Sequence, residues 1–341
     1  MTTKRVCVIG DGSWGTALAL KLVEAGHEVT LWSAFAETYQ RLAETRENTR
    51  YLPGVRLPDA LRLSADPFEA ADGIVAAVSV VPTQYLRSTM ARFEDALGGQ
   101  VPIFSASKGL EMETLRRPSE ILASVLGPRP LVVLTGPSHA EEVARGLPAS
   151  VIAASEDEAA AQLAQELFNH ARFRVYTNDD PLGAELAAAY KNVIALAAGI
   201  ADGLELGDNA KAALVSRGMV EAARFGASFG ARPRTFFGLA GAGDLMATCF
   251  SQHSRNRRVG EAIGRGASLQ EVLDDMEMVA EGVWTTRALF GPEQEARPRD
   301  LPIAEQVHAV LFDGLDPSEA VVALMEREPI AEMQGLELDL P

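Results

Sequence analysis

The sequence predicts an α/β protein, with an N-terminal Rossmann-like, doubly wound, mostly parallel sheet followed by an all-helical C-terminal domain. Three observations support this. Short β-branched runs alternate with helical stretches through the first half of the chain, a glycine-rich turn follows the first run, and only helical patterns recur from Pro181 onward. We therefore expect a dinucleotide-binding domain over residues 1–180 and a helical substrate-binding domain over residues 181–341.

The first half supplies the strands of the expected sheet. They are Arg5–Ile9, Glu28–Trp32, Gly73–Val78, Pro102–Ala106, Leu131–Leu134, Ser150–Ala154 and Phe173–Tyr176. Helical patterns separate most of them, at Gly15–Ala25, Ala36–Arg46, Pro82–Arg92, Arg117–Val125 and Glu156–Asn169. Strands and helices that alternate at this spacing are typical of a parallel sheet covered by helices.

The second half reads as helices throughout. They are expected at Pro181–Gly203, Asn209–Phe229, Thr235–Ala240, Arg257–Arg265, Ser268–Asp275, Thr285–Gly291, Ala304–Phe312 and Pro317–Arg327. The first of these carries apolar side chains at three- and four-residue steps, which is the period of a helix with one packed face.

Composition limits the function classes. The 341 residues are 47% hydrophobic and 23% charged, as in an ordinary globular protein, and the net charge of −16 argues against nucleic acid or an anionic membrane as partner. The apolar run Val6–Ile9 is too short for a signal peptide, and no stretch approaches the 18 uninterrupted apolar residues of a membrane span. The 2 cysteines, Cys7 and Cys249, are far apart, so we expect reduced thiols and a cytoplasmic protein. An anionic ligand must then be held by locally clustered cations.

A glycine-rich turn opens the chain. In "VCVIGDGSWGTALALKL" an apolar strand leads through Gly10-x-Gly12-x-x-Gly15 into a helix. Gly10 suits the tight turn, Gly12 lets the backbone approach a pyrophosphate, and Gly15 permits close helix packing. The helix N-terminus favours the phosphates, so this stretch predicts a dinucleotide site.

The cofactor preference is less defined. A site that prefers NAD usually carries Asp or Glu at the end of the second strand, where it bonds the ribose 2′-hydroxyl. This chain has Trp32, Ser33 and Ala34 there, with neither an acid nor an arginine. We expect NADPH or mixed use of NADPH and NADH.

One lysine stands in an apolar helix. In "LAAAYKNVIALAAGI", Lys191 shares its face with Ala187, Ala195 and Ala198, which leave it in a groove of methyl groups. It is either a lysine that extends from the rim of a buried helix to solvent or a desolvated catalytic amine with a lowered pKa.

Other polar residues follow strands or open helices. "SASKGLE" supplies Lys108, "LTGPSHAEE" supplies Gly136, Ser138 and Ala140, "GLAGAGDLMATC" supplies Asp244 in a glycine-rich turn, and "SQHSRNRRVG" supplies Ser254, Arg255 and Asn256. Each has a structural alternative: a surface lysine, a helix cap for Asp244, and a solvated basic face for the arginines. Together they suit a small phosphorylated carbonyl or alcohol, because arginine binds phosphate through two hydrogen bonds. No Cys/His spacing indicates a metal site.

At this point the chain resembles the bacterial NAD(P)-dependent glycerol-3-phosphate dehydrogenases. The resemblance runs from Val6 to about Met325 and includes "GDGSWGTALA", "YLPGV", "SASKGLE", "LTGPSHAEE", "YKNVIALAAGIADGL", "NAKAALVSRG", "GLAGAGDL" and "SRNRRVG", in that order. It implies reduction of dihydroxyacetone phosphate to sn-glycerol 3-phosphate, a precursor of phospholipids, by a homodimer.

The resemblance also implies residue roles. Lys191 would be the proton donor and acceptor. Independently of the resemblance, Asn192, the next residue in the chain, is expected to orient Lys191 by a hydrogen bond. The substrate would be held by Lys108, Gly136, Ser138, Lys191, Asp244, Ser254, Arg255 and Asn256. The cofactor would contact Gly10, Gly12, Ser13, Trp14, Gly15, Tyr51, Lys108, Ala140, Arg255, Val279 and Glu281. Two positions depart from the family pattern: Ala34, where Arg or His is usual, and Asp11, where Ala is commoner.

Two other functions fit part of the pattern. A dehydrogenase of hydroxy acids or nucleotide sugars would share the architecture, and sugar oxidation would need a catalytic cysteine, for which Cys249 is the candidate in the second half. A dinucleotide-binding sensor without turnover would need neither Lys191 nor Asp244. Consumption of NADPH or NADH on addition of dihydroxyacetone phosphate separates the enzyme from the sensor.

Overall fold

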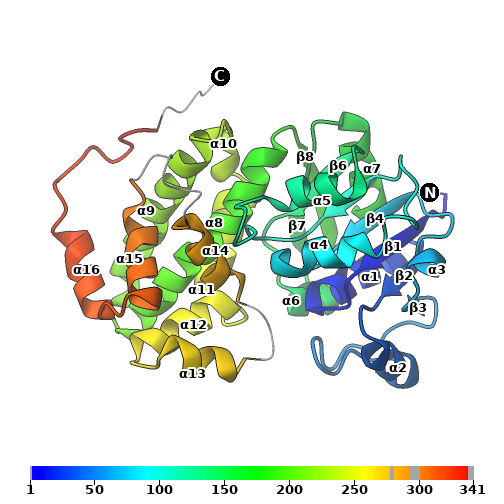
Figure 1. Ribbon diagram of the computed structural model, residues 1–341, viewed down its shortest axis with the longest axis horizontal. Helices are drawn as coiled ribbons and strands as arrows, with labels where there is room; N and C mark the ends of the chain where they lie inside the picture. The colour runs from blue at the N-terminus through cyan, green and yellow to red at the C-terminus, as the bar shows by residue number, and fades with distance from the viewer. Residues whose placement is uncertain (1, 277–279, 292–299, 337–341) are drawn as a thin grey trace. The chain divides into compact units, whose positions relative to one another are not determined.

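The computed structural model describes residues 2–276, 280–291 and 300–336 (Figure 1). The chain forms two compact units. Unit 1 contains Met1–Ser107 and Pro118–Pro181, and unit 2 contains Lys108–Arg117 and Leu182–Pro341. The short segment Lys108–Arg117 therefore belongs to the same unit as the C-terminal helices. A single domain boundary at residue 180 would assign this segment to the N-terminal domain.

Unit 1 is built on an 8-stranded sheet of order β3-β2-β1-β4-β5-β6-β7-β8. The strands are β1 (Arg5–Ile9), β2 (Glu28–Trp32), β3 (Arg62–Ser64), β4 (Ala76–Ser79), β5 (Ile103–Ser105), β6 (Leu131–Thr135), β7 (Ala149–Ala154) and β8 (Phe173–Asn178). Every neighbouring pair is parallel except β6 and β7, which are antiparallel. The first six strands have the order of a dinucleotide-binding sheet, and this confirms the predicted fold class.

Helices cover both faces of this sheet. They are α1 (Ser13–Glu24), α2 (Ala36–Thr45), α3 (Pro67–Ala70), α4 (Thr83–Ala91), α5 (Pro118–Leu126), α6 (Ala140–Ala144) and α7 (Glu158–Phe168). One buried cluster joins the sheet to α1, α6 and α7, and a second joins it to α3, α4 and α5. Because both faces are buried, the central strands are apolar runs rather than alternating ones.

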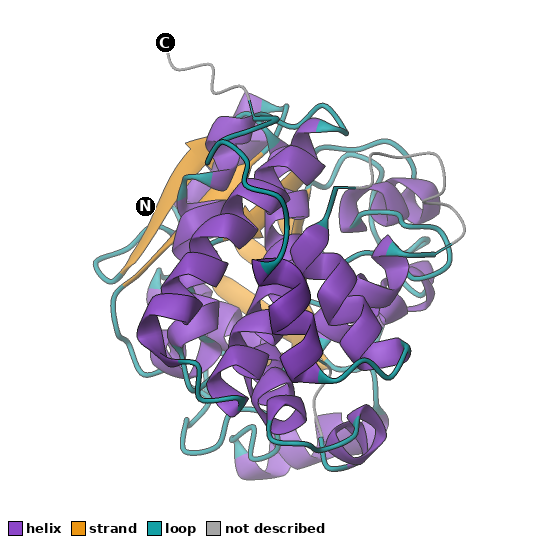
Figure 2. Cartoon of the chain, turned by 90° about the vertical axis from the view of Figure 1, so that its left-hand side faces the viewer, coloured by secondary structure: helices purple, strands orange, loops and turns teal. Residues whose placement is uncertain are grey.

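Unit 2 is helical in its described residues, and the strands of Figure 2 all belong to unit 1. Its elements are α8 (Pro181–Gly203), α9 (Gly207–Ala227), α10 (Pro233–Phe236), a π-helical turn η1 (Leu239–Gly243), α11 (Asp244–Phe250), α12 (Arg255–Gly264), α13 (Leu269–Asp274), α14 (Glu281–Leu289), α15 (Pro302–Phe312) and α16 (Pro317–Met325). The glycine-rich stretch before Asp244 is thus a π-helical turn rather than a simple loop.

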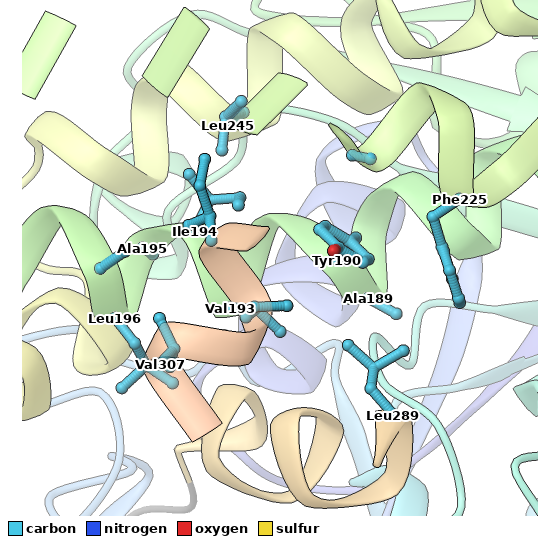
Figure 3. Close-up of a cluster of buried hydrophobic side chains, with 14 of the residues drawn as sticks. Ala189, Tyr190, Val193, Ile194, Ala195, Leu196, Phe225, Leu245, Leu289 and Val307 are labelled. Atoms are coloured by element: carbon cyan, nitrogen blue, oxygen red, sulfur yellow. The ribbon is translucent and has the colours of Figure 1, made fainter. Parts of the chain in front are cut away.

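Helix α8 is the centre of unit 2. Tyr190, Val193 and Ile194 are fully buried, and Figure 3 shows Leu289 and Val307 beside this helix. Among the described residues α8 is also the helix that is long and apolar enough to cross a membrane, but its apolar window is 100% buried inside the protein. A core helix meets the same criteria of length and composition, and the burial identifies α8 as one.

Two glycine pairs bring α8 and α12 into backbone contact. A Cβ atom on Gly199 would lie 2.0 Å from the carbonyl oxygen of Arg257, and one on Gly260 would lie 2.0 Å from that of Leu196. Gly203 and Gly264 repeat this close approach one turn further along. The crossing fixes the start of α12 relative to α8.

We expect Gly260→Ala to destabilise the protein. The new methyl group meets a backbone oxygen that can move only with its helix, and overpacking of this kind costs about 1–3 kcal/mol. The melting temperature and the urea midpoint of the variant measure the loss. Gly99→Ala is the control, because nothing lies within 4 Å of a Cβ at that position. Equal stability of the two variants would contradict the close crossing.

Candidate active site

Lys191 lies inside unit 2 and forms two polar contacts. Its side chain is 8% exposed, its Nζ donates to Asp244 Oδ1 at 2.6 Å, and it donates to Thr248 Oγ1 at 2.7 Å. Both partners come from α11, one helical turn apart. Lys191 is therefore a buried, paired amine and not a lysine that extends to solvent.

A second lysine shares the same carboxylate. Lys108 Nζ donates to Asp244 Oδ2 at 2.7 Å, and its side chain is 18% exposed. The segment that carries Lys108 is joined to α8 by an ion pair between Arg117 and the buried Glu185 at 2.7 Å. Asp244 thus bridges Lys108 and Lys191, and it does not cap α11, whose N-cap residue is Gly243.

Burial and charge set the proton affinity of this cluster. Burial lowers the pKa of Lys191 to about 8, because Asp244 only partly offsets the loss of solvent and Lys108 lowers the pKa further. Burial alone would raise the pKa of Asp244, but the two lysines hold it below its ordinary value. The carboxylate therefore stays ionised, while the Lys191 amine can gain or lose a proton near neutral pH.

Side-chain hydrogen bonds connect the start of α12 to α8. Ser254 is the N-cap residue of α12 and accepts from the backbone N–H of Arg257 at 3.2 Å. Asn256 donates to Asn192 at 3.0 Å and accepts from the backbone N–H of Gly282 at 2.9 Å. Asn192 was expected to orient Lys191. That expectation is wrong, since Asn192 bonds Asn256 and the lysine is held by α11.

Tyr190, next to Lys191, is fixed from the other side of α8. Its hydroxyl donates to the buried Glu221 at 2.8 Å, and Glu221 also accepts from the backbone N–H groups of Ile303 and Ala304 at the start of α15. The rotation of α8 about its axis is thereby set by α9 and α15.

In unit 1 the glycine-rich loop fits a dinucleotide. Gly10 has φ +114°, and a Cβ there would lie 2.9 Å from the Val80 carbonyl oxygen. A Cβ on Gly15 would lie 1.9 Å from the Gly10 oxygen, whereas nothing lies within 4 Å of one on Gly12. The first and third glycines are thus needed for the turn and the helix packing, and Gly12 leaves the open space that a pyrophosphate requires. Ser13 and Trp14 begin α1, and the indole Nε1 of Trp14 is buried without a hydrogen-bond partner.

Asn48 joins a second loop to this cradle. Its amide donates to the Asp11 carbonyl at 2.7 Å and to Thr16 at 2.8 Å, and its oxygen accepts from the backbone N–H of Tyr51 at 3.2 Å. This contact brings the "YLPG" loop beside the glycine-rich loop. Sequence reasoning missed Asn48, because the two groups to which its amide donates, in Asp11 and Thr16, lie more than 30 residues away in the sequence.

The remaining predicted positions lie at element ends. Gly136 follows β6 with φ +140°, where a Cβ would lie 3.0 Å from Val151 Cα, and its carbonyl accepts from Ser138 Oγ at 2.9 Å. Ala140 begins α6, and Glu281 begins α14. Val279 lies outside the described residues.

The alternative based on cysteine does not fit. Cys249 is fully buried, and burial raises its thiol pKa to about 12, so the thiolate that a nucleophilic cysteine needs is disfavoured. Over the described part of the chain, no group of three or more His, Cys, Asp or Glu side chains could hold a metal ion.

The fold and the paired lysine cluster define the class of protein: a two-unit dinucleotide-dependent oxidoreductase. Models of the NAD-dependent glycerol-3-phosphate dehydrogenase N-terminus and C-terminus match residues 5–161 and 180–322. The chain belongs to the NAD-dependent glycerol-3-phosphate dehydrogenase family, and it is an NAD(P)-dependent oxidoreductase.

Individual relatives agree over nearly the whole chain. A glycerol-3-phosphate dehydrogenase [NAD(P)+] of Geobacillus kaustophilus is 49% identical over 336 residues, which cover 98% of this chain and 97% of the relative. One from Chlorobium phaeobacteroides is 46% identical over 96% of this chain and 99% of the relative. The crystal structure of the Coxiella burnetii glycerol-3-phosphate dehydrogenase superposes with a TM-score of 0.90 at 38% identity, over 95% of this chain and 99% of that one.

Proposed function

We propose that the protein reduces dihydroxyacetone phosphate to sn-glycerol 3-phosphate with Lys191 as the proton donor, and that it runs the reverse reaction with Lys191 as the acceptor. The observation that carries the proposal is the buried Lys191 amine, paired with Asp244 at 2.6 Å and with a pKa of about 8. A bound nicotinamide supplies the hydride that the ketone carbon receives.

The lysine cluster accounts for the proton transfer. As the carbonyl oxygen gains negative charge, the Lys191 ammonium stabilises it and then donates its proton. The amine is left neutral, and its burial favours that form. Lys108 adds a second positive charge beside the same oxygen, and Asp244 holds both lysines in place.

The substrate phosphate is assigned to the start of α12. Ser254, Arg255 and Asn256 occupy the cap and first turn of a helix of 10 residues, where backbone N–H groups and the helix dipole favour an anion. The chain as a whole carries a net charge of −16, so an anionic substrate needs a local positive charge. Arg255 supplies that charge. By family resemblance, Gly136 and Ser138 also contact the substrate.

The cofactor is assigned to the glycine-rich cradle, with Ser13, Trp14, Tyr51 and Ala140 as further contacts. Lys108, Arg255, Val279 and Glu281 are proposed contacts by family resemblance. The protein accepts both NADH and NADPH. The preference for NADPH that the residues after the second strand indicate stays a prediction.

Cellular role and assembly follow from the same resemblance. We propose a cytoplasmic homodimer that supplies glycerol 3-phosphate for phospholipid synthesis. Light scattering of the purified protein measures the assembly, and a mass of one chain would contradict the dimer.

The test of the proposed function is an absorbance assay. Purified protein is mixed with NADPH or NADH, and the loss of absorbance is followed on addition of dihydroxyacetone phosphate and of other triose phosphates. We expect consumption that requires dihydroxyacetone phosphate and yields sn-glycerol 3-phosphate. Binding of the nucleotides without consumption of either would instead support a sensor.

We expect Arg255→Ala to impair substrate use. Loss of a charge-assisted hydrogen bond of about 1.5–3 kcal/mol raises the KM for dihydroxyacetone phosphate about 10- to 100-fold. Steady-state kinetics measure it, with Arg258→Ala, an exposed arginine on the same helix, as the control. Normal kinetics in the Arg255 variant would make this arginine part of a solvated basic face.

A further inference from the structure

Asp11 lies at the point where the first two strands of the sheet end. It follows Gly10 in the glycine-rich loop and is 9% exposed, and one of its carboxylate oxygens accepts from Ser33 Oγ at 2.7 Å. Ser33 directly follows β2 and is 1% exposed. The parallel register pairs Ile9 with Trp32, and the Gly10 N–H donates to the Trp32 carbonyl at 3.2 Å, so the loop after β1 and the end of β2 are adjacent.

The end of β2 is where dinucleotide folds select their cofactor. An acidic side chain there bonds the 2′-hydroxyl of the adenosine ribose in NAD-dependent proteins, and an arginine nearby accommodates the 2′-phosphate of NADP. Here Ser33, Ala34 and Phe35 follow β2 and supply neither group. The cation at this strand end is Arg92, which follows α4, donates to the Ala34 carbonyl at 3.0 Å and lies over the Trp32 ring. The hydrogen bond between Asp11 and Ser33 brings a carboxylate to this strand end from the neighbouring loop.

We propose that Asp11 takes the part of the missing acid after β2, accepts a hydrogen bond from the ribose 2′-hydroxyl, and makes the protein favour NADH over NADPH. This inference rests on one part of the proposed function, namely that unit 1 binds the coenzyme. This preference is the opposite of the one predicted from the residues that follow β2 in the sequence, which favour NADPH or mixed use.

The position of the carboxylate is well defined. The Asp11 carbonyl accepts from Asn48 and from Thr16, which fix the backbone, and Ser33 fixes the side chain. A carboxylate has about four acceptor positions, and the Ser33 hydroxyl uses one of them. Asp11 can therefore accept a further hydroxyl without giving up its partner.

The charges around Asp11 decide between the two cofactors. Burial raises its pKa, while the Ser33 hydroxyl and the Arg41 and Arg50 cations favour its charged form. A 2′-phosphate would meet this carboxylate at short range, and like charges brought together out of water repel strongly. Arg41, Arg50 and Arg92 would instead attract that phosphate. Arg50 and Arg92, however, are exposed and lie over the rings of Tyr51 and Trp32, whereas Asp11 is buried and already oriented.

The test is a binding measurement that does not need turnover. Calorimetry on wild type, Asp11→Asn and Glu37→Gln compares NADH with NADPH, and ADP-ribose with its 2′-phosphate. Asp11→Asn keeps the shape of the side chain and removes its charge. Glu37→Gln removes the same charge from an exposed site on α2 and is the matched control.

In the wild type we expect NADH to bind at least tenfold more tightly than NADPH. Asp11→Asn should bring the two affinities within about threefold, mostly through tighter binding of NADPH, and Glu37→Gln should leave the ratio unchanged. Tighter binding of NADPH by the wild type, or a ratio that Asp11→Asn does not change, would overturn the inference. So would absence of binding of both nucleotides, which would also remove the cofactor site. Binding with the expected ratio but no turnover of dihydroxyacetone phosphate would leave the inference standing and contradict the proposed function.

Discussion

Lys191→Met is expected to reduce kcat for dihydroxyacetone phosphate by a factor on the order of 10² to 10⁴, the usual contribution of a positioned general acid. Methionine fills a similar volume but has no proton to donate. Asp244 then keeps its ion pair with Lys108 and loses the one with residue 191. The dissociation constant of the dinucleotide should stay nearly unchanged, since the glycine-rich cradle belongs to the other unit. Stopped-flow and steady-state kinetics, together with fluorescence titration of NADH, measure both quantities.

A matched variant separates chemistry from folding. Lys211→Met removes another buried lysine of unit 2, whose ammonium pairs with Asp202 at 2.7 Å and which has no part in the proposed cluster. It should lose stability and retain kcat. If Lys191→Met lost dinucleotide binding instead of turnover, or if both variants lost turnover equally, Lys191 would not have the role proposed for it.

Asp244→Asn is expected to shift the pH dependence of the reaction. In the wild type Asp244 raises the pKa of Lys191 against burial and against the charge of Lys108. Without the carboxylate, burial and the charge of Lys108 dominate, so the pKa of Lys191 falls below its value of about 8. Asparagine keeps the shape of the side chain, but its single amide oxygen can accept from only one of the two lysines, which now bond the two separate carboxylate oxygens.

The sign follows from the protonation state that each direction needs. Ketone reduction requires the ammonium form of Lys191, so kcat for reduction should decline as the pH rises through about 8 in the wild type. In Asp244→Asn this decline should begin at a lower pH, while oxidation of sn-glycerol 3-phosphate should gain activity on the acid side. Profiles in the two directions, measured at saturating substrate, show the shift. An unmoved profile would mean that Asp244 does not control the proton affinity of Lys191.

The sheet and the long helices could be predicted from local pattern. Apolar runs and turn residues locate β1 and β2, and α8 begins and ends at the predicted residues Pro181 and Gly203. Strand β3 was missed because it is only three residues long, with Arg62 exposed, and it exists by pairing with β2.

The lysine, the glycines and the basic cluster could likewise be selected from the sequence, because their chemistry is unusual for their surroundings. Their partners could not. Thr248 bonds Lys191 from 57 residues away, and Ser33 reaches Asp11 across 22 residues. The spacing from Asp244 to Thr248 places both on one helix face and was a signal that could have been used.

The role of Lys191 as the proton donor is tested by the pH dependence of kcat for ketone reduction in wild type and in Lys191→Met. If Lys191 donates the proton, the wild-type rate declines through one ionisation near pH 8, and the variant keeps a small residual rate that shows no such step. The same step near pH 8 in the variant would show that another group donates the proton.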